Sequence, residues 1–464
     1  MTMFRTFADL KRVHFVGIGG AGMSGIAEVL LDYQLEVSGC DAVANEATER
    51  LAALGAAIAI GHSADHVEGV DLVVKSSAVP DDHVEIVAAR KRGITVARRS
   101  EMLGELMRLK YGIAVAGTHG KTTTTSMVGA ILTDAGLDPT VIVGGRLRVS
   151  GTGARLGKSD YLVAEADEFD RSFLRLMPVI AVVTTIDVDH LDTYADLAAI
   201  QQAFVAFADR VPFFGRVILC LDDPNIQAVL PELASRRLLT YGLTPQADLS
   251  AVAIEARPHG SRFTVRSHEG GDLGTIDLPM PGRHNIRNAL AATGVALALG
   301  LPFEEIARAL GSFGGVHRRF EHLGTFHGAE VVDDYAHHPT EVAATLEAAR
   351  QTCPSGRVFA IFQPHLFSRT RDHAEAFGRA LLAADRAWVT PIYPSREQPL
   401  PGVRSELVVD AARAAGHHHV ELVEDWQALP PRLAESVAAG DLILTLGAGD
   451  VVKLARRLVE GGTP

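Results

Sequence analysis

The chain has 464 residues, of which 47% are apolar and 22% charged, and its net charge is −12. This length predicts about three domains of an ordinary globular protein. The acidic balance argues against a broad nucleic-acid or anionic-membrane surface. The longest charge-free run, 288–303, has 16 residues, fewer than the roughly 20 of a membrane span, so no membrane insertion is expected. Three scattered cysteines in no metal spacing indicate a reduced, cytoplasmic compartment.

Short apolar runs alternate with helical patterns along the first hundred residues, which is typical of a parallel sheet. The expected strands are 13–16, 35–38, 56–60, 72–75 and 94–96, and the expected helices are 22–33, 45–54 and 100–108.

A second block begins with the apolar run 113–116 and continues with buried-strand patterns at 161–164 and 179–184, a β-patterned stretch at 249–278 and a helix at 285–300. A third block brings its own strands at 331–332, 358–362, 387–390 and 442–446. We therefore expect domain boundaries near residues 108 and 315.

The strongest motif is a phosphate loop at 117–123, Gly-Thr-His-Gly-Lys-Thr-Thr, between a strand and a helix. Its backbone N–H groups and the helix N-terminus favour anions, Lys121 would reach the β- and γ-phosphates, and the Thr122 hydroxyl would bind Mg²⁺. The loop is a shortened P-loop, because Val115 stands where the usual first glycine would be. The competing interpretation is a plain tight turn with an incidental lysine.

Acidic residues follow two of the central strands. Glu165-Ala166-Asp167-Glu168 follows the strand that ends at Ala164, and Asp187-Val188-Asp189-His190 follows the strand that ends near Ile186. Ligands in open α/β sheets bind at the carboxyl ends of strands, so these groups are candidates to hold Mg²⁺ beside a phosphate. Taken alone, the second motif also fits a capping and turn cluster.

An earlier glycine loop, Gly17-Ile18-Gly19-Gly20-Ala21-Gly22, lies between the first strand and its helix, and Asp41 follows 24 residues after Gly17. This pattern indicates a pyrophosphate, which either a nicotinamide dinucleotide or a nucleotide sugar would supply. Ser76-Ser77-Ala78 ends a later strand at the same edge and would complete the pocket. A purely structural glycine turn is the alternative.

Further motifs follow in order: His284-Asn285-Ile286-Arg287-Asn288, Arg318-Arg319-Phe320, the segment 333–341 (Asp-Asp-Tyr-Ala-His-His-Pro-Thr-Glu), Phe362-Gln363-Pro364-His365 and Gly447-Ala448-Gly449-Asp450. With the two glycine loops and the acidic motifs, this order resembles the Mur ligases of peptidoglycan synthesis over about residues 13–455. The resemblance is strongest to the branch that joins L-alanine to UDP-N-acetylmuramate.

The resemblance implies an α/β fold of three domains. These are an N-terminal Rossmann-like domain that binds the UDP-sugar (1–108), a central P-loop ATPase-like domain with a mostly parallel sheet (109–315) and a C-terminal Rossmann-like domain that binds the amino acid (316–464). It implies that ATP phosphorylates the lactyl carboxylate and that the amine of L-alanine attacks the acyl phosphate. The cofactors would be ATP and Mg²⁺, and both a monomer and a homodimer stay open.

Residue roles follow from matching positions. For the UDP-sugar they are Gly17, Gly19, Gly20, Gly22, Asp41, Ser76, Ser77 and Ala78. For ATP they are Gly117, Thr118, His119, Gly120, Lys121, Thr122, Thr123, Asn285, Asn288, Arg319 and Asp334. For the metal they are Thr122, Glu165 and His190, and for the amino acid Tyr335, His337, His365 and Arg369. Lys121, Glu165, His190 and Arg319 are the expected catalytic group.

At two places the sequence differs from a pattern found in other Mur ligases. Some members have an arginine directly after Gln-Pro-His, where this chain has Leu366, so Arg369 would bind the amino-acid carboxylate more alone. No lysine lies between His190 and Arg216, whereas several sibling ligases use a carbamylated lysine there, which favours the alanine-adding branch. The alternatives are a recycling ligase that attaches a whole tripeptide, an oxidoreductase suggested by the first glycine loop alone, and a non-catalytic binding protein.

Overall fold

The computed structural model describes residues 9–76, 78–144, 153–190, 193–395 and 397–461. The chain divides into two compact units. The first comprises 1–252, 264–276 and 287–314, and the second comprises 253–263, 277–286 and 315–464. No helix within the described ranges is long and apolar enough to cross a membrane. The predicted boundaries at 108 and 315 stay predictions.

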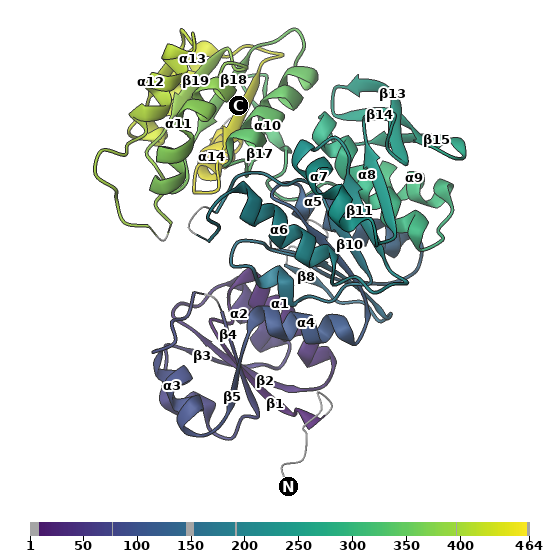
Figure 1. The fold of residues 1–464 in the computed structure, drawn as a ribbon. Helices are drawn as coiled ribbons and strands as arrows, with labels where there is room; N and C mark the ends of the chain where they lie inside the picture. Colours follow the sequence, from purple (N-terminus) through teal and green to yellow (C-terminus); the bar gives the residue numbers. More distant parts are fainter. Residues whose placement is uncertain (1–8, 77, 145–152, 191–192, 396, 462–464) are drawn as a thin grey trace. The chain divides into compact units, whose positions relative to one another are not determined.

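The first unit begins with a parallel five-stranded sheet in the order β3-β2-β1-β4-β5 (Figure 1). Its strands are β1 (Arg12–Val16), β2 (Glu36–Asp41), β3 (Ala57–Ile60), β4 (Leu72–Lys75) and β5 (Thr95–Arg98). Helices α1 (Ala21–Asp32), α2 (Glu46–Ala53) and α4 (Arg99–Arg108) lie on one side of the sheet, and α3 (Val84–Lys91) with the 3₁₀ turn η2 (Ala64–Val67) lies on the other. The strand order reverses beside β1, so the first glycine loop stands at the switch point where nucleotides bind in such sheets.

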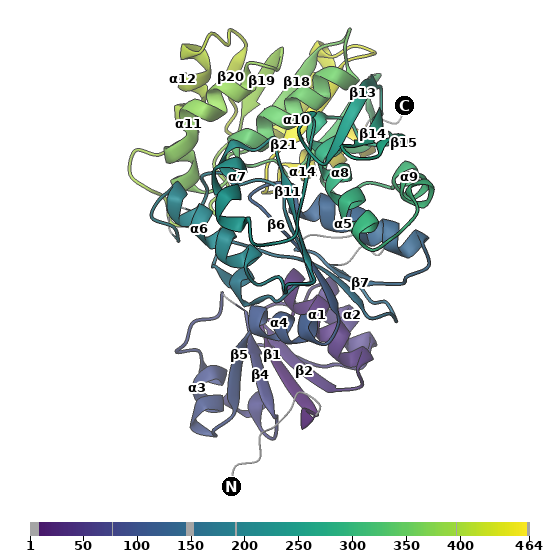
Figure 2. The same cartoon turned by 45° about the vertical axis from the view of Figure 1, so that its right-hand side comes forward.

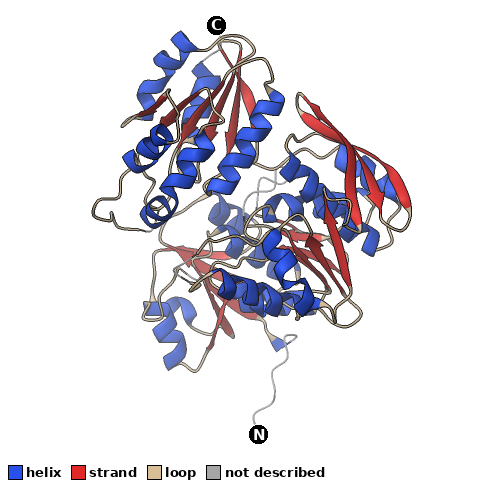
Figure 3. Cartoon of the chain, turned by 45° about the horizontal axis from the view of Figure 1, so that its top comes forward, coloured by secondary structure: helices blue, strands red, loops and turns tan. Residues whose placement is uncertain are grey.

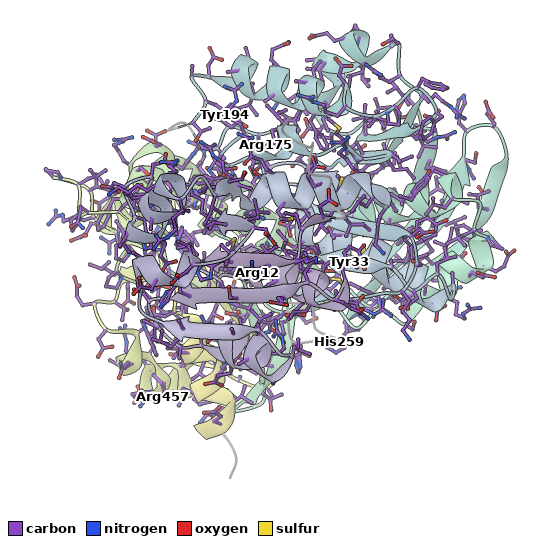
Figure 4. The ribbon with its side chains drawn as sticks, turned by 90° about the horizontal axis from the view of Figure 1, so that it is seen from below. Arg12, Tyr33, Arg175, Tyr194, His259 and Arg457 are labelled. Atoms are coloured by element: carbon purple, nitrogen blue, oxygen red, sulfur yellow. The ribbon has the colours of Figure 1, made fainter. Side chains whose placement is uncertain are left out.

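The sequence explains the placement of these elements. Asn45 begins α2 by accepting hydrogen bonds from the N–H groups of Ala47 and Thr48, and Thr48 completes a capping box. β1 reads Arg-Val-His-Phe-Val and is buried from its second residue on, as in a central strand covered on both faces. Figure 4 labels Arg12, where β1 begins, and Tyr33, directly after α1.

A ten-stranded sheet follows, in the order β15-β14-β13-β12-β11-β10-β6-β9-β7-β8. Its strands are β6 (Tyr111–Ala116), β7 (Thr140–Ile142), β8 (Ala154–Arg155), β9 (Tyr161–Glu165), β10 (Ile180–Val183), β11 (Arg216–Cys220), β12 (Leu238–Gly242), β13 (Leu249–Arg257), β14 (Gly260–Ser267) and β15 (Gly271–Leu278). Its helices are α5 (Lys121–Asp134), η3 (Ser172–Arg175), α6 (Leu197–Ala208), α7 (Pro224–Val229), η4 (Leu230–Leu233), α8 (Arg283–Ala298) and α9 (Phe303–Gly311). β6 pairs in parallel with β9 on one side and β10 on the other, so the loops after these three strands meet at one edge.

The second unit contains a six-stranded sheet in the order β16-β17-β21-β18-β19-β20, parallel except for β16 (Figure 2). Its strands are β16 (Glu321–Phe326), β17 (Ala329–Asp334), β18 (Val358–Phe362), β19 (Arg386–Val389), β20 (Val420–Leu422) and β21 (Leu442–Leu446). Its helices are α10 (Pro339–Thr352), α11 (Phe367–Leu381), α12 (Glu406–Ala414), η5 (Trp426–Ala428), α13 (Leu429–Ser436) and α14 (Val452–Gly461).

Adjacent strand residues in this sheet belong to different cores. Val332 and Phe362 pack with α10, α11 and α12, whereas Val331 and Ile361 pack with α13 and α14. The central strands β18 and β21 are therefore buried along their whole length, which explains their continuous apolar sequences. Figure 3 shows the strands of each sheet in red and the helices that cover it in blue. The α/β fold class and the mostly parallel sheets are confirmed.

Candidate active site

The phosphate loop connects β6 to α5 and depends on two glycines. Gly117 has φ +132°, and a Cβ there would lie 2.0 Å from Thr184 Oγ1. Gly120 has φ +81° and precedes Lys121, the first residue of α5. Only glycine fits both positions, so the backbone N–H groups of the loop and the helix N-terminus are arranged as in an anion site.

The other predicted loop residues are held by the neighbouring strand end. Thr118 N–H donates to the Thr185 carbonyl at 3.0 Å, and Asp187 N–H donates to Thr118 Oγ1 at 2.9 Å. His119 Nε2 lies 3.2 Å from Asp187 Oδ2. Thr123 is buried in the first turn of α5. The segment after β10 therefore fixes the shape of the loop.

Lys121 folds back across its own loop. Its Nζ donates to the Gly117 carbonyl at 2.7 Å and lies 2.8 Å from Glu168 Oε2, and the Glu168 side chain is only 3% exposed. Burial alone lowers the pKa of Lys121, but the carboxylates of Glu168, Asp167 and Glu165 raise it more, so the lysine stays charged. Lys121 is thus a fixed cation at the loop.

Glu165, at the end of β9, faces the same helix start. Its Oε2 accepts a hydrogen bond from Thr122 Oγ1 at 3.0 Å and another from Gly144 N–H at 2.8 Å. A hydroxyl and a carboxylate in contact are oxygen donors of the kind that Mg²⁺ prefers. The structure therefore brings together two of the three predicted metal ligands.

His190 has a left-handed backbone, with φ +56°, which is uncommon for a residue with a side chain. Its Nε2 lies 4.0 Å from Glu168 Oε1 and 3.7 Å from Asp189 Oδ2, and its ring meets Phe169 edge to face. The hydroxyl of Tyr194, labelled in Figure 4, donates to the Glu168 carbonyl at 2.7 Å. His190 therefore lies beside the acid that holds Lys121.

The two predicted adenine-facing residues both lie on α8. Asn288 accepts a hydrogen bond from Thr124 Oγ1 at 3.3 Å, and its Oδ1 would lie 2.6 Å from a Cβ at Gly120. Asn288 therefore borders the phosphate loop. Asn285 donates from Nδ2 to the Pro281 carbonyl at 2.8 Å.

The first glycine loop is held by the end of β2. The N–H groups of Gly17 and Ile18 donate to the Cys40 carbonyl, and Gly19 N–H donates to Asp41 Oδ2 at 2.8 Å. Asp41 thus shapes the loop directly. Gly20 precedes α1 and Gly22 lies in its first turn.

Ser76 packs beside this loop, because a Cβ at Gly17 would lie 3.4 Å from Ser76 Cβ. Ala78 N–H lies 3.4 Å from Ser76 Oγ. Ser77 lies outside the described residues. The structure therefore places Ser76 beside the first glycine loop, as the sequence predicts.

In the second unit, charged residues gather where β17 ends. The Asp334 carboxylate accepts hydrogen bonds from Phe320 N–H and Ala336 N–H, both at 2.7 Å. Burial raises the pKa of Asp334 to about 6, although Arg319 and the two N–H groups oppose the rise. The guanidinium of Arg319 lies 5.3 Å from the centre of the Tyr335 ring.

The predicted amino-acid residues form a second group in this unit. The rings of His337 and His365 are 5.7 Å apart, and Arg369 Nη1 lies 3.3 Å from His365 Nδ1. Burial lowers the pKa of His337 to about 3, so its imidazole is neutral at pH 7. Leu366 has φ +68° and precedes α11, on whose first turn Arg369 lies.

Sequence reasoning left three contact residues out of the site. Glu168 ends the motif Glu165-Ala166-Asp167-Glu168, and the structure pairs its carboxylate with Lys121, which the motif does not predict. Arg318, the neighbour of Arg319, donates to Asp333 Oδ2 at 2.8 Å and to the Gly447 carbonyl at 2.6 Å. Glu341 lies 3.2 Å from His337 Nδ1, and its i+4 spacing from His337 was the available signal.

Comparisons with known proteins identify the family of the chain from three consecutive segments. Three family models match in order: the Mur ligase family catalytic domain (residues 12–111), the Mur ligase middle domain (115–296) and the Mur ligase glutamate ligase domain (318–449). The chain belongs to the Mur ligase family.

Two similar proteins are UDP-N-acetylmuramate–L-alanine ligases. The one from Salinibacter ruber is 50% identical over 98% of this chain and 96% of its own length. The one from Geobacter sulfurreducens is 49% identical over 96% of both chains.

Among solved structures, the UDP-N-acetylmuramate–alanine ligase MurC of Thermotoga maritima matches with a TM-score of 0.80 and 30% identity, over 97% of this chain and 99% of that one. A murein peptide ligase from Psychrobacter arcticus matches with a TM-score of 0.68 and 26% identity, over 97% of this chain and 98% of that one.

Proposed function

We propose that this chain is a UDP-N-acetylmuramate–L-alanine ligase that supplies peptidoglycan precursors in the cytoplasm. The observation that carries this function is the 50% identity to such ligases over 98% of the chain. An intact phosphate loop with a charged lysine supports it. Both observations argue against the oxidoreductase and the non-catalytic alternatives.

The reaction has two steps. The lactyl carboxylate attacks the γ-phosphorus of ATP, which breaks the bond to the β-phosphate oxygen and gives an acyl phosphate and ADP. The amine of L-alanine, having lost a proton, then attacks the acyl carbon, and the tetrahedral intermediate expels inorganic phosphate to leave the amide. A free carboxylate is a poor electrophile, so phosphorylation supplies the leaving group.

The central residues serve the first step by holding negative charge in place. The loop N–H groups and Lys121 bind the β- and γ-phosphates, and Lys121 then exchanges Glu168 for phosphate oxygens. Thr122 and Glu165 fit a Mg²⁺ ion through their oxygens, with His190 as the further predicted ligand. When bound, the ion neutralises phosphate charge.

The remaining predicted residues bind the three substrates. Gly17, Gly19, Gly20, Gly22, Asp41, Ser76, Ser77 and Ala78 hold the UDP-sugar. Asn285, Asn288, Arg319 and Asp334 contribute to ATP binding. Tyr335, His337, His365 and Arg369 bind L-alanine, whose carboxylate is suited to the two-pronged guanidinium of Arg369.

Phosphate release from ATP tests the proposal. The assay contains Mg²⁺ and UDP-N-acetylmuramate, with L-alanine in one arm and the tripeptide L-Ala-γ-D-Glu-diaminopimelate in the other. We expect release with L-alanine and none in the Lys121→Met variant. Phosphate release in the tripeptide arm but not in the L-alanine arm would assign the chain to the recycling branch. The absence of phosphate release in both arms would overturn the catalytic proposal.

A further inference from the structure

A second cluster of chemistry-bearing side chains lies in the N-terminal sheet, on residues with no role in the proposed reaction. His14, Cys40, His66 and Glu85 each offer one ligand atom, and these four atoms all lie within 4.8 Å of one another. We propose that these four side chains form a tetrahedral binding site for a structural Zn²⁺ ion.

The fold brings the four residues together from distant parts of the sequence. His14 pairs with Ser38 and Val16 with Cys40 in the register of β1 and β2, so His14 and Cys40 point to the same face of the sheet. His66 on η2 and Glu85 on α3 cover that face. This explains why the cysteine shows no metal spacing along the chain.

The distances suit a small ion. His14 Nε2 lies 3.1 Å from Glu85 Oε2, Cys40 Sγ lies 3.0 Å from the same oxygen, and His66 Nδ1 lies 3.0 Å from Glu85 Oε1. Ligand atoms of a tetrahedral zinc site are about 3.4–3.6 Å apart, given bond lengths of about 2.0–2.3 Å. An expansion by a few tenths of an ångström therefore admits the ion.

The chemistry of the donors also favours zinc. The two negative charges of one thiolate and one carboxylate, with two neutral imidazoles, balance the charge of a divalent cation. This neutrality is needed because His14, Cys40 and Glu85 are at most 2% exposed, and an unbalanced charge is costly to bury. A mixed sulfur, nitrogen and oxygen set suits Zn²⁺ better than Mg²⁺ or Ca²⁺, which prefer oxygen alone.

Neighbouring groups orient the proposed ligands. His14 Nδ1 lies 2.9 Å from Ser38 Oγ, which leaves Nε2 directed at the cluster, and Ser63 N–H donates to Glu85 Oε1 at 3.1 Å. Such contacts to the outer atoms of the ligands are typical of metal sites. The side chain of His62 is 30% exposed, and its Nδ1 lies 3.2 Å from Cys40 Sγ.

The site lies directly beneath the first glycine loop. The Cys40 carbonyl accepts hydrogen bonds from Gly17 N–H at 2.9 Å and Ile18 N–H at 3.0 Å. Zinc bound at Cys40 would therefore stiffen the backbone that supports this loop. The metal assignment itself does not depend on which ligand the loop binds.

The test is metal content and Co²⁺ spectroscopy on the full chain, purified without a histidine tag and dialysed against metal-free buffer. We expect one zinc per chain, and a Co²⁺ complex with tetrahedral d–d bands and a thiolate charge-transfer band. Cys40→Ser and His66→Asn should each weaken Zn²⁺ binding at least about tenfold in competition with a chromophoric chelator. Loss of the charge-transfer band in Cys40→Ser would tie the metal to that sulfur.

Two matched controls separate this site from adventitious binding. Cys353→Ser removes another buried cysteine, whose Sγ lies 3.1 Å from the Gly440 carbonyl, and His418→Asn changes an exposed histidine in the run 417–419. Both should keep one zinc per chain. No retained zinc, or zinc retained equally by Cys40→Ser and His66→Asn, would overturn the proposal. His66→Asn, at a partly exposed position, keeps the test valid if Cys40→Ser fails to fold.

Discussion

Replacing Lys121 with methionine separates two roles of this lysine, because its amine pairs with Glu168 and, in the proposed mechanism, holds the ATP phosphates. The amine lies 2.8 Å from the Glu168 carboxylate, whose side chain is 3% exposed. Removing one partner of a buried ion pair typically costs about 3–5 kcal/mol of stability, because the other charge stays buried. Glu168 limits that cost by taking up a proton.

The pKa of Glu168 gives the expected pH dependence. Burial raises this pKa from 4.5 to about 7, and Lys121 opposes the rise, so the Lys121→Met change raises it further. A carboxyl group with a higher pKa in the folded chain binds more protons when folded, so stability falls as pH rises toward the folded-state pKa. In the wild type, stability therefore stops falling with this titration near pH 7. In the variant it keeps falling above pH 7, because the pKa of Glu168 is higher there.

The size of the expected stability difference between Lys121→Met and the wild type follows from the protonation equilibrium of Glu168. Each pH unit above 7 should destabilise Lys121→Met by up to about 1.4 kcal/mol more than the wild type. Between pH 7 and 8.5 the difference in the free energy of unfolding should therefore grow by up to about 2 kcal/mol. Urea denaturation followed by circular dichroism measures it.

The double variant Lys121→Met, Glu168→Gln is the control, because it removes the titrating group. The pH-dependent part of the difference should vanish in it, while ATP turnover stays abolished and UDP-sugar binding stays intact in both variants. A difference that is constant from pH 7 to 8.5, or one that persists in the double variant, would refute the reasoning.

Three further changes test other parts of the site. Gly117→Ala places a Cβ 2.0 Å from Thr184 Oγ1 at φ +132°, so kcat/KM for ATP should fall at least about tenfold, and unchanged ATP kinetics would contradict the role of the loop. Because burial raises the pKa of Asp334 from 3.8 to about 6, stability should fall by about 2 kcal/mol from pH 4 to 6 relative to Asp334→Asn. Tryptophan fluorescence in urea measures this, since both tryptophans lie in the second unit, and parallel pH profiles would argue against it. Removing Mg²⁺ with a chelator should stop phosphate release. Glu165→Gln should raise the Mg²⁺ concentration that gives the half-maximal rate at least about tenfold. An unchanged half-maximal Mg²⁺ concentration in this variant would exclude Glu165 as a ligand.

Much of the fold was predictable because its signals are local. The strand Leu72–Lys75 and the strands Val358–Phe362 and Leu442–Leu446 were predicted with the observed bounds, since continuous apolar runs between turns mark buried parallel strands. Other ends shifted by a few residues. The second strand was expected at 35–38 and runs Glu36–Asp41, because backbone pairing with β1 continues past the last strongly apolar residue.

The contacts within the site were less predictable, because they depend on which side chains the sheet edges bring together. The positions of Lys121, Thr122 and Glu165 followed from the motif, and the sheet order brings them to one edge. Glu168 gained no role from the sequence, since nothing local shows that its carboxylate turns toward Lys121. The neighbours of Cys40 come from segments separated by up to 71 residues, which no spacing rule detects.

The end of β9 and the residues just after it place two carboxylates beside the start of α5. Glu165 contacts the Thr122 hydroxyl, and Glu168, three residues later, contacts the Lys121 amine. The chain thus places its own acids against Lys121 and Thr122, the two side chains proposed to hold the phosphates and Mg²⁺. In the proposed mechanism, phosphate oxygens replace the Glu168 contact, and the acid left behind is buried. Lys121→Met leaves the Glu168 carboxylate unpaired in the same way. The pH dependence of this variant's stability therefore reports how strongly Lys121 favours the charged form of Glu168, which is the interaction that the phosphates replace in the proposed mechanism.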